Sequence, residues 1–398
     1  MLSSLCNLIR IHTYKLTRLL PTILLATALF SFLLPAYASE KYELQIEIGK
    51  QLYFDKNLSK NRTQSCATCH SPEHGFIDAR DSKLKGAVSL GDDGQSFGDR
   101  SAPTASYANQ IPSFHLRKDG QYVGGQFWDG READLKGQAG GPPLNQIEMG
   151  MPDISSIISR LQENQFYIDS FITLYGDDIF DNPELAYQAL ADSIATFEQT
   201  DFFSPFDSKY DRYLKGEYEL TEKEDLGMTL FFSEQFTNCN QCHQLDKQPT
   251  STKEVFSDYT FHNIGVPVNT VVREHNKTPK EYVDKGLFNH PKIDSPDMIG
   301  KFKVPTLRNI AVTAPYMHNG VFQELKTVID FYNKYNSKNE KRQINPETGL
   351  PWAQPEIDQN ISFKELESGP ALDDKRINAL IAFLKILTDQ GYEHMIQP

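Results

Sequence analysis

The chain has 398 residues, of which 39% are hydrophobic and 23% are charged, with 24 glycines and 22 prolines. This composition supports a packed core and excludes a collagen-like, low-complexity or largely disordered chain. At roughly 150 residues per domain the length predicts two domains. The formal net charge of −13 argues against a nucleic-acid binder that relies on bulk positive charge.

Residues 1–38 have the features of a signal peptide. Three basic residues and no acidic residue precede an apolar run over residues 19–34, and Ala36-Tyr37-Ala38 has the small-x-small form of a cleavage site. We expect cleavage after Ala38 and a periplasmic protein. An uncleaved membrane anchor is the alternative, because an apolar stretch of about 16 residues is near the lower limit for spanning a bilayer.

Four of the five cysteines form two identically spaced motifs. They read Cys66-Ala67-Thr68-Cys69-His70 and Cys239-Asn240-Gln241-Cys242-His243, both C-x-x-C-H, the pattern for covalent c-type haem attachment. Each pair of thiols can reach the two vinyl groups of one porphyrin, and the histidine that follows is placed under the iron. A redox pair or half a zinc site leaves the repeated histidine unexplained. We therefore predict two covalently bound c-type haems, with His70 and His243 as iron ligands.

A longer repeat precedes each motif. Ile48-Gly49-Lys50-Gln51-Leu52-Tyr53-Phe54 and Leu226-Gly227-Met228-Thr229-Leu230-Phe231-Phe232 share an apolar-Gly-x-x-Leu-aromatic-Phe pattern with helical spacing. Two homologous haem modules are therefore expected.

The remaining chain has helical patterns separated by long loops. Residues 81–102 are rich in glycine and charge, which predicts a long loop. Apolar periodicity predicts helices over 154–161, 184–197 and 373–388, whereas 261–279 reads as irregular or short-stranded. We expect a mainly α fold made of two cytochrome c-like haem domains with long ordered loops, at residues 39–205 and 206–398.

Beyond the haem motifs, the chain resembles the bacterial di-haem cytochrome c peroxidases over nearly all of its length after the signal peptide. The matching segments are Ala102-Pro103-Thr104, Gln126-Phe127-Trp128-Asp129-Gly130-Arg131, Gln138-Ala139-Gly140-Gly141-Pro142, Asn145-Gln146-Ile147-Glu148-Met149, Phe261-His262-Asn263-Ile264-Gly265, Val304-Pro305-Thr306-Leu307-Arg308-Asn309 and Ala314-Pro315-Tyr316-Met317-His318-Asn319-Gly320.

The resemblance implies an activity and its partners. Such proteins reduce hydrogen peroxide to water with two electrons from a small periplasmic donor, a c-type cytochrome or a copper protein. The N-terminal domain would be peroxidatic and the C-terminal domain would transfer electrons. Relatives are commonly homodimers and often hold a calcium ion between the domains, although no ligand of that ion can be read from these residues.

The resemblance also implies roles for single residues. Met317 corresponds to the axial sulfur ligand opposite His243, with Met298 as a second candidate, and Trp128 corresponds to the tryptophan between the haems. Glu148, with Gln138 beside it, corresponds to the distal acid and base at the N-terminal haem. Residue spacing alone also permits Met149 or Met151 as a sixth ligand there.

One feature departs from many relatives, in which a loop histidine caps the peroxidatic iron of the oxidised enzyme. Residues 83–100 contain no histidine. We therefore predict an N-terminal haem that is five-coordinate or water-bound as isolated, or else capped by His115. Whether the enzyme needs reductive activation stays open.

The leading prediction is thus a periplasmic di-haem peroxidase, with electrons entering at the C-terminal haem and passing through Trp128. One alternative is a non-catalytic di-haem electron carrier. The other is a di-haem oxidase similar to those that modify tryptophan in a partner protein. Those oxidases carry tyrosine where the C-terminal haem has methionine, so Met317 argues against this alternative, while the adjacent Tyr316 leaves the register open.

Overall fold

A computed structural model describes residues 39–80, 82–245 and 251–397. The predicted signal peptide at residues 1–38 lies outside the described residues. Within the described part of the chain, no helix combines the length and apolar character needed to cross a membrane.

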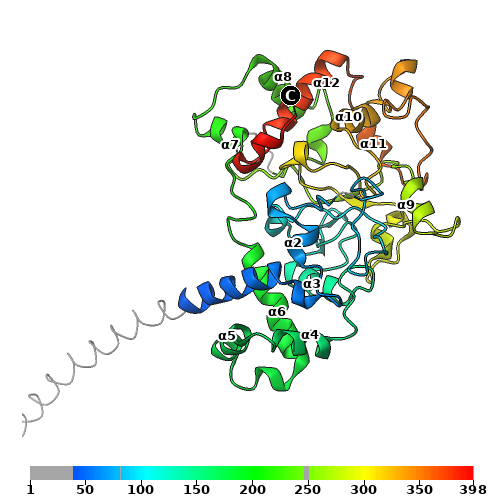
Figure 1. Ribbon diagram of the computed structural model, residues 1–398. Helices are drawn as coiled ribbons and strands as arrows, with labels where there is room; N and C mark the ends of the chain where they lie inside the picture. Colours follow the sequence, from blue (N-terminus) through cyan, green and yellow to red (C-terminus); the bar gives the residue numbers. More distant parts are fainter. Residues whose placement is uncertain (1–38, 81, 246–250, 398) are drawn as a thin grey trace, which may run out of the picture.

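The first half of the described chain is built around one long helix pair (Figure 1). Residues 39–54 are helical and lie against α6. The side chain of Asn182 caps α6, and Pro183 occupies its first position, where a missing N–H costs nothing. The helices of this half are α2 (Cys66–Cys69), α3 (Leu135–Ala139), α4 (Ile154–Leu161), α5 (Gln165–Tyr175) and α6 (Pro183–Glu198).

The second half repeats this helix pair with α8 and α12, which lie at the opposite end of the molecule (Figure 1). Its helices are α7 (Lys209–Leu214), α8 (Glu222–Phe232), α9 (Thr270–His275), α10 (Leu325–Asn333), α11 (Phe363–Leu366) and α12 (Asp374–Lys385). The predicted helices over 154–161, 184–197 and 373–388 are confirmed within two or three residues. Residues 261–279, predicted to be irregular or short-stranded, begin with a two-residue strand as predicted, but the prediction missed α9.

A glycine lets the two helices of each pair approach closely. A Cβ atom on Gly49 would lie 1.9 Å from the carbonyl oxygen of Ser193, and one on Gly227 would lie 2.0 Å from that of Ala379. No side chain fits between backbones at such distances. The repeated glycine of the sequence therefore marks the same helix crossing in both halves.

Buried apolar side chains form two principal clusters. One is made of residues between Ile48 and Phe203, and the other of residues between Tyr210 and Leu387. This division agrees with two domains, while the boundary between residues 205 and 206 stays a prediction.

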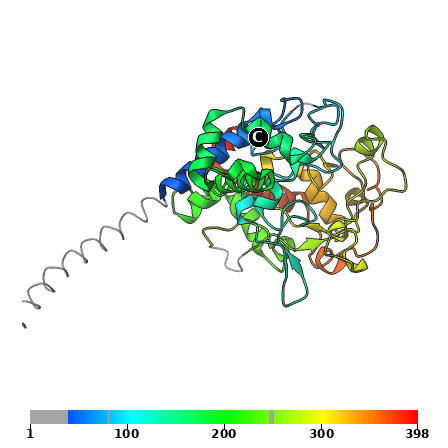
Figure 2. The ribbon, with the colours of Figure 1, turned by 90° about the horizontal axis from the view of Figure 1, so that it is seen from below.

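Strands are few and short among the described residues. β1 (His115–Leu116) pairs antiparallel with β2 (Tyr122–Val123), and β3 (Phe261–His262) pairs antiparallel with β4 (Phe302–Lys303). The β1–β2 hairpin projects from the body of the molecule (Figure 2). The mainly α expectation is confirmed, and the cytochrome c-like character of each half stays a prediction.

Single turns of 3₁₀ helix connect many of these elements. They are η1 (Lys56–Leu58), η2 (Pro72–His74), η3 (Ala108–Gln110), η4 (Pro142–Leu144), η5 (Ile179–Asp181), η6 (Cys239–Gln241), η7 (Leu287–Asn289), η8 (Pro296–Met298), η9 (Ile310–Val312), η10 (Glu340–Gln343) and η11 (Gln390–Met395).

The predicted loop at 81–102 has neither helix nor strand over its described residues, yet it is well packed. Leu84, Val88 and Phe97 are buried against Val272 of α9. The carboxylate of Asp92 accepts hydrogen bonds from Ser59, Asn61 and Thr63, with the shortest distances at 2.6–2.7 Å. The loop is thus held by both halves of the chain.

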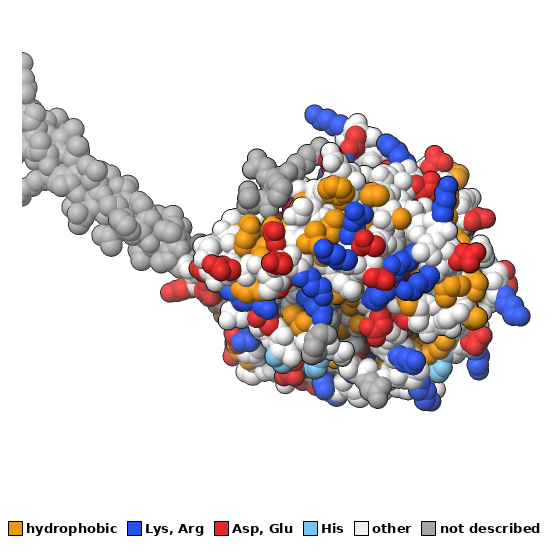
Figure 3. Space-filling model, turned by 90° about the horizontal axis from the view of Figure 1, so that it is seen from above, with side chains coloured by type: hydrophobic (Ala, Val, Ile, Leu, Met, Phe, Trp, Pro, Cys, Tyr) orange, Lys and Arg blue, Asp and Glu red, His pale blue; other side chains and the backbone are white. Residues whose placement is uncertain are grey.

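Charge is mixed on the face that Figure 3 shows, with acidic and basic side chains interspersed among small apolar patches. The net charge of −13 is therefore not gathered on that face.

Replacing Gly49 by alanine tests the close helix crossing. We expect Gly49→Ala to lower the free energy of unfolding by about 3 kcal/mol, because the new methyl group forces two backbones apart. Urea unfolding followed by circular dichroism measures this loss. Gly391→Ala is the control, since nothing lies within 4 Å of the added Cβ. Equal losses in both variants would contradict the packing argument.

Candidate haem centres

The first C-x-x-C-H motif places its two thiols on one helical turn. Cys66 and Cys69 begin and end α2, and a capping box between Ser65 and Thr68 holds the start of the turn. The backbone N–H of His70 then donates to the carbonyl of Cys66 at 2.9 Å. Residues three apart lie on the same side of a helix, so both thiols face one space. No disulfide joins the cysteines at 66, 69, 239 and 242.

A backbone carbonyl orients each motif histidine. The Nδ1 atom of His70 lies 3.3 Å from the carbonyl oxygen of Phe76, and that of His243 lies 3.0 Å from the carbonyl oxygen of Phe256. A carbonyl can only accept, so each Nδ1 carries the proton and each Nε2 keeps a free lone pair for a metal. Burial lowers the pKa of both imidazoles, which keeps them neutral and able to coordinate.

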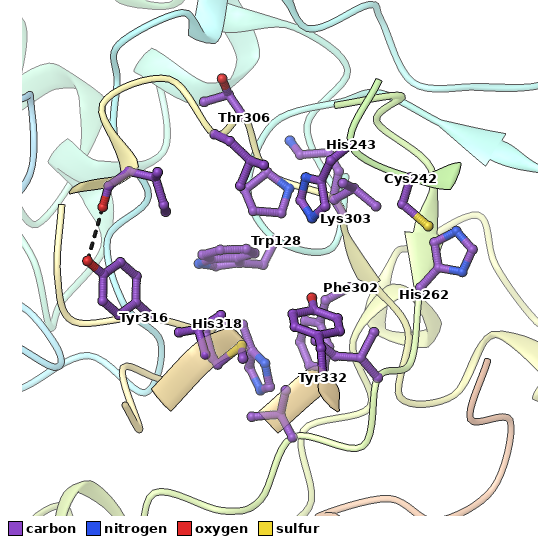
Figure 4. Close-up of a pocket in the computed structure, with 18 of the residues that line it drawn as sticks. Trp128, Cys242, His243, His262, Phe302, Lys303, Thr306, Tyr316, His318 and Tyr332 are labelled. Carbon is purple, nitrogen blue, oxygen red and sulfur yellow. Dashed lines mark hydrogen bonds between the residues drawn. The ribbon is translucent and has the colours of Figure 1, made fainter. Parts of the chain in front are cut away.

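A cavity of about 310 Å³ lies beside the second motif (Figure 4). Cys239, Cys242 and His243 line it, together with many apolar side chains from α8, α10 and α12. A largely apolar space with two thiols and one free imidazole nitrogen fits a haem. The residues around both motifs therefore fit the predicted cofactors.

Tyr332 of α10 faces His243 across this cavity, with its hydroxyl group directed inward (Figure 4). Burial, followed by the nearby thiols of Cys242 and Cys239, raises the pKa of this phenol above its ordinary value. Its hydroxyl makes no hydrogen bond within the described residues. In contrast, the hydroxyl of Tyr316 donates to the carbonyl of Ile310 at 3.1 Å. Tyr332 is thus a phenol that is free to meet a ligand in the cavity.

Sequence reasoning missed Tyr332. The preceding residues of α10 are apolar at helical spacing, so Tyr332 is indistinguishable from an ordinary core aromatic. To identify Tyr332 from the sequence, one would need to know where α10 lies relative to His243. No sequence motif gives that information.

Met317 also lines the cavity, as predicted for an axial ligand. It has a positive φ of 73° and packs against the aromatic cluster around Tyr316 and Phe322. Its role as a ligand stays a prediction. Met298 packs with Phe261 and Leu287 in a separate cluster and is absent from the cavity wall.

Trp128 lines the same cavity and is held by both halves of the chain (Figure 4). Its indole N–H donates to the carbonyl of Ser101 at 2.8 Å, while its own carbonyl accepts from the backbone N–H of Lys303 at 2.9 Å. The structure therefore brings Trp128 to the second haem centre, and its place between two haems stays a prediction.

An ion-pair chain beside Trp128 connects the two halves. The guanidinium of Arg100 lies 2.8 Å from Asp129 and 2.6 Å from Asp284, and Asp129 also pairs with Arg131 at 2.9 Å. The carboxylates of Asp129 and Asp284 are both buried, so breaking either ion pair would leave a buried charge without its partner. This chain restrains the segment that carries Trp128.

Glu148 lies close to the first motif. Burial raises the pKa of its carboxyl, and Arg131 opposes that rise. Its charge also acts on the Cys69 thiol, which places the two side chains near one another. The carbonyl of Glu148 accepts from the backbone N–H of Asp92, so the loop at 82–102 holds this residue. Gln138 lies half-buried on α3, and no hydrogen bond among the described residues joins it to Glu148.

The structure also places the three other candidates. Met149 and Met151 are buried in the first core cluster, against which Cys66 packs, and a role for either as a sixth ligand stays a prediction. His115 is exposed on the β1–β2 hairpin, where its Nδ1 lies 2.8 Å from the carbonyl of Ser113. The hairpin packs through Phe114 on Phe261, so the structure does not bring His115 to His70.

Comparisons with known proteins agree with these centres. A family model described as di-haem cytochrome c peroxidase matches residues 43–219. The methylamine utilization protein MauG of Paracoccus denitrificans is 50% identical over 350 residues, which are 88% of this chain and 90% of that protein. The cytochrome c551 peroxidase of Pseudomonas aeruginosa is 30% identical over 294 residues, 72% of this chain and 71% of that protein. The solved structure of the diheme peroxidase BthA from Burkholderia thailandensis matches with a TM-score of 0.77 at 28% identity, covering 89% of this chain and 88% of that one.

Removing one pair of thiols tests covalent attachment. We expect the mature wild-type protein to carry the mass of two haems and the double variant Cys66→Ala, Cys69→Ala to carry the mass of one, because thioether bonds need the thiols. Intact-protein mass spectrometry measures both, and also reports cleavage after Ala38. Cys6→Ala is the control and leaves the adducts unchanged. A wild-type chain without adducts would contradict the assignment.

Proposed function

Since the chain belongs to the di-haem cytochrome c peroxidase family and is a haem oxidoreductase, we propose that it uses hydrogen peroxide to oxidise a side chain of a partner protein. That side chain is tryptophan in the oxidases that the chain resembles. The observation that carries the proposal is the phenol of Tyr332 opposite His243. The 50% identity to MauG supports it.

Two c-type haems, covalently held by the cysteine pairs, would supply the redox chemistry, one open to peroxide and one exchanging electrons with it. His70 and His243 would hold the two irons through Nε2, because Nδ1 is committed to a carbonyl. Tyr332, rather than Met317, would be the residue that binds the second of these irons from the side of the cavity facing His243. A phenolate oxygen stabilises a more oxidised iron, whereas a thioether raises the iron potential. Tyr332 therefore suits a centre that stores oxidising equivalents.

Glu148 supplies proton transfer in this proposal. Cleaving a peroxide bond needs one group that takes the proton from the near oxygen and returns it to the departing oxygen. Burial raises the pKa of the Glu148 carboxyl above its ordinary value, which favours a group that both holds and releases a proton. Gln138 is assigned to the same pocket as a hydrogen-bonding partner of the peroxide.

Trp128 connects the two centres in this proposal. Its hydrogen bonds to Ser101 and from Lys303, and the Arg100 ion pairs next to it, hold the indole in one orientation. Fixed geometry of this kind favours electron exchange between the halves.

A cytochrome c peroxidase that takes electrons from a small redox protein is the second candidate. Met317 lines the same cavity. A thioether ligand there would raise the potential of the iron, which suits a haem that accepts electrons from a donor protein. The likeness to the Pseudomonas aeruginosa peroxidase supports this candidate. The non-catalytic carrier is set aside, because the chain is an enzyme by family.

Further features of the resemblance belong to the proposal. Export to the periplasm is proposed on the predicted signal peptide, and a homodimer is proposed on the family resemblance. Within the described residues, no group of three or more His, Cys, Asp or Glu side chains could hold a metal ion.

The N-terminal centre is proposed to be open as isolated, with no need for reductive activation. The loop at 82–102 has no histidine to remove, and Asp92 and buried apolar residues already hold it in place.

Two variants decide the axial ligand. We expect Tyr332→Phe to convert the six-coordinate spectrum of the C-terminal haem to a five-coordinate one, because the phenol oxygen is lost. Met317→Leu should leave that spectrum unchanged. Electron paramagnetic resonance and near-infrared absorption measure both. The reverse pattern would assign Met317 and favour the peroxidase that draws on a small donor.

Mixing the all-ferric protein with peroxide tests the function and Glu148 together. We expect reaction without pre-reduction, and faster oxidation of N-acetyltryptophanamide than of ferrocytochrome c. In Glu148→Gln the reaction with peroxide should slow by about 10²–10⁴-fold, because the proton carrier is lost. Glu184→Gln, an exposed change on α6, is the control. Rapid ferrocytochrome c turnover that requires pre-reduction would establish the second candidate instead.

A further inference from the structure

The repeated helix crossing aligns the two haem centres residue by residue. Gly49 contacts Ser193 and Phe197 in the first half, and Gly227 contacts Ala379 and Phe383 in the second. Phe197 therefore corresponds to Phe383, and the residues that follow them, Glu198 and Leu384, correspond to each other. The residue four positions after each glycine corresponds as well, which pairs Tyr53 with Phe231.

These pairs differ in polarity. Leu384 and Phe231 line the cavity beside His243. By this correspondence their counterparts Glu198 and Tyr53 take the equivalent places beside the first motif, and both interact electrostatically with the Cys66 thiol. The wall of the N-terminal centre thus contains a carboxyl group where the C-terminal centre has a leucine.

Glu198 is buried there without a partner. The residue is 6% exposed, and its Oε2 atom has no hydrogen-bond partner among the described residues. Its charge acts on the Cys66 thiol and on the Tyr53 phenol, which places Glu198 close to both. The Tyr53 hydroxyl is not its partner, since it donates to the carbonyl of His70 at 3.0 Å.

An unpaired carboxylate in apolar surroundings is costly, so such a group holds its proton unless a positive charge appears nearby. Burial raises the pKa of Glu198 to about 8, with no opposing charge. At neutral pH the group is therefore mainly a neutral acid in the absence of a bound cofactor.

We propose that Glu198 is a proton-exchanging acid of the N-terminal haem pocket, which loses its proton when the adjacent haem is oxidised and regains one when that haem is reduced. The inference rests on the haem of the proposed function. Oxidation by one electron adds one positive charge beside the carboxyl, which favours the carboxylate. One proton then passes to water. On reduction, one electron and one proton are taken up together, so the pocket returns to the same charge.

Other titratable groups surround this pocket. Tyr53 on the helix at 39–54 and Cys66 on α2 face Glu198 most closely, and Cys66 no longer titrates once it forms a thioether. On the Cys69 side lie Glu148 and the Arg80–Asp78 pair, whose atoms are 2.5 Å apart. Of these groups, Glu148 is the other carboxyl whose pKa is raised by burial. Glu148→Gln therefore serves as a comparison.

Potentiometric titration of the holoprotein at several pH values tests the proposal. We expect the midpoint potential of the N-terminal haem to fall as pH rises, by up to about 59 mV for each tenfold drop in proton concentration. Glu198→Gln and Glu198→Leu should remove most of this slope, whereas Glu184→Gln on the same helix keeps it. Leu384→Glu should add a slope to the C-terminal haem. A slope that persists in Glu198→Gln would overturn the proposal.

A second measurement needs no variant. The infrared difference spectrum between oxidised and reduced wild-type protein should contain a carboxylic-acid C=O band that disappears on oxidation. Its absence would overturn the proposal even if the Glu198 variants fail to fold. If Glu198 had only a structural role, replacing it would leave the pH dependence of the midpoint potential unchanged, and oxidation would not change the carboxylic-acid band. Failure of the proposed function is distinguishable, since it would appear earlier as a protein without two haem adducts or without reaction with peroxide.

Discussion

Both haem centres depend on a single hydrogen bond between an imidazole and a backbone carbonyl. The carbonyls of Phe76 and Phe256 accept from Nδ1 of His70 and His243, and both phenylalanines have positive φ values, of 59° and 57°. This backbone turn directs each carbonyl back at the ring. Without it either nitrogen could carry the proton, and Nε2 would not reliably keep the lone pair that a metal needs.

The two centres share a scaffold but differ in what faces the cofactor. The glycine crossings at Gly49 and Gly227 set the same helix geometry in both halves. Onto this geometry the second half adds Tyr332 from α10, and the first half adds the acid Glu198 from α6. Trp128 and the Arg100 ion pairs tie the halves together at the cavity. The same helix crossing thus carries different side chains in the two halves.

Features that depend on local sequence could be predicted. The C-x-x-C-H motifs bring thiols and imidazole together within five residues, and α4, α6 and α12 follow from apolar periodicity. The loop over 81–102 followed from glycine and charge, although its tight packing did not. The helix α9 was missed because six residues give too short a pattern, and α10 was not identified at all.

The sequence by itself determined that two modules of one kind are present and which cysteines and histidines would hold their cofactors, because these contacts lie close along the chain. Only the tertiary structure decided what stands opposite His243. Tyr332 is one of 18 tyrosines, and Met317 had the clearer motif. The distance along the chain from His243 to α10 is long, so the facing side chain depends on how α10 packs across the cavity, and no local pattern encodes that packing. The same reason applies to Glu198. Its place beside the Cys66 thiol depends on how α6 packs against the helix at residues 39–54.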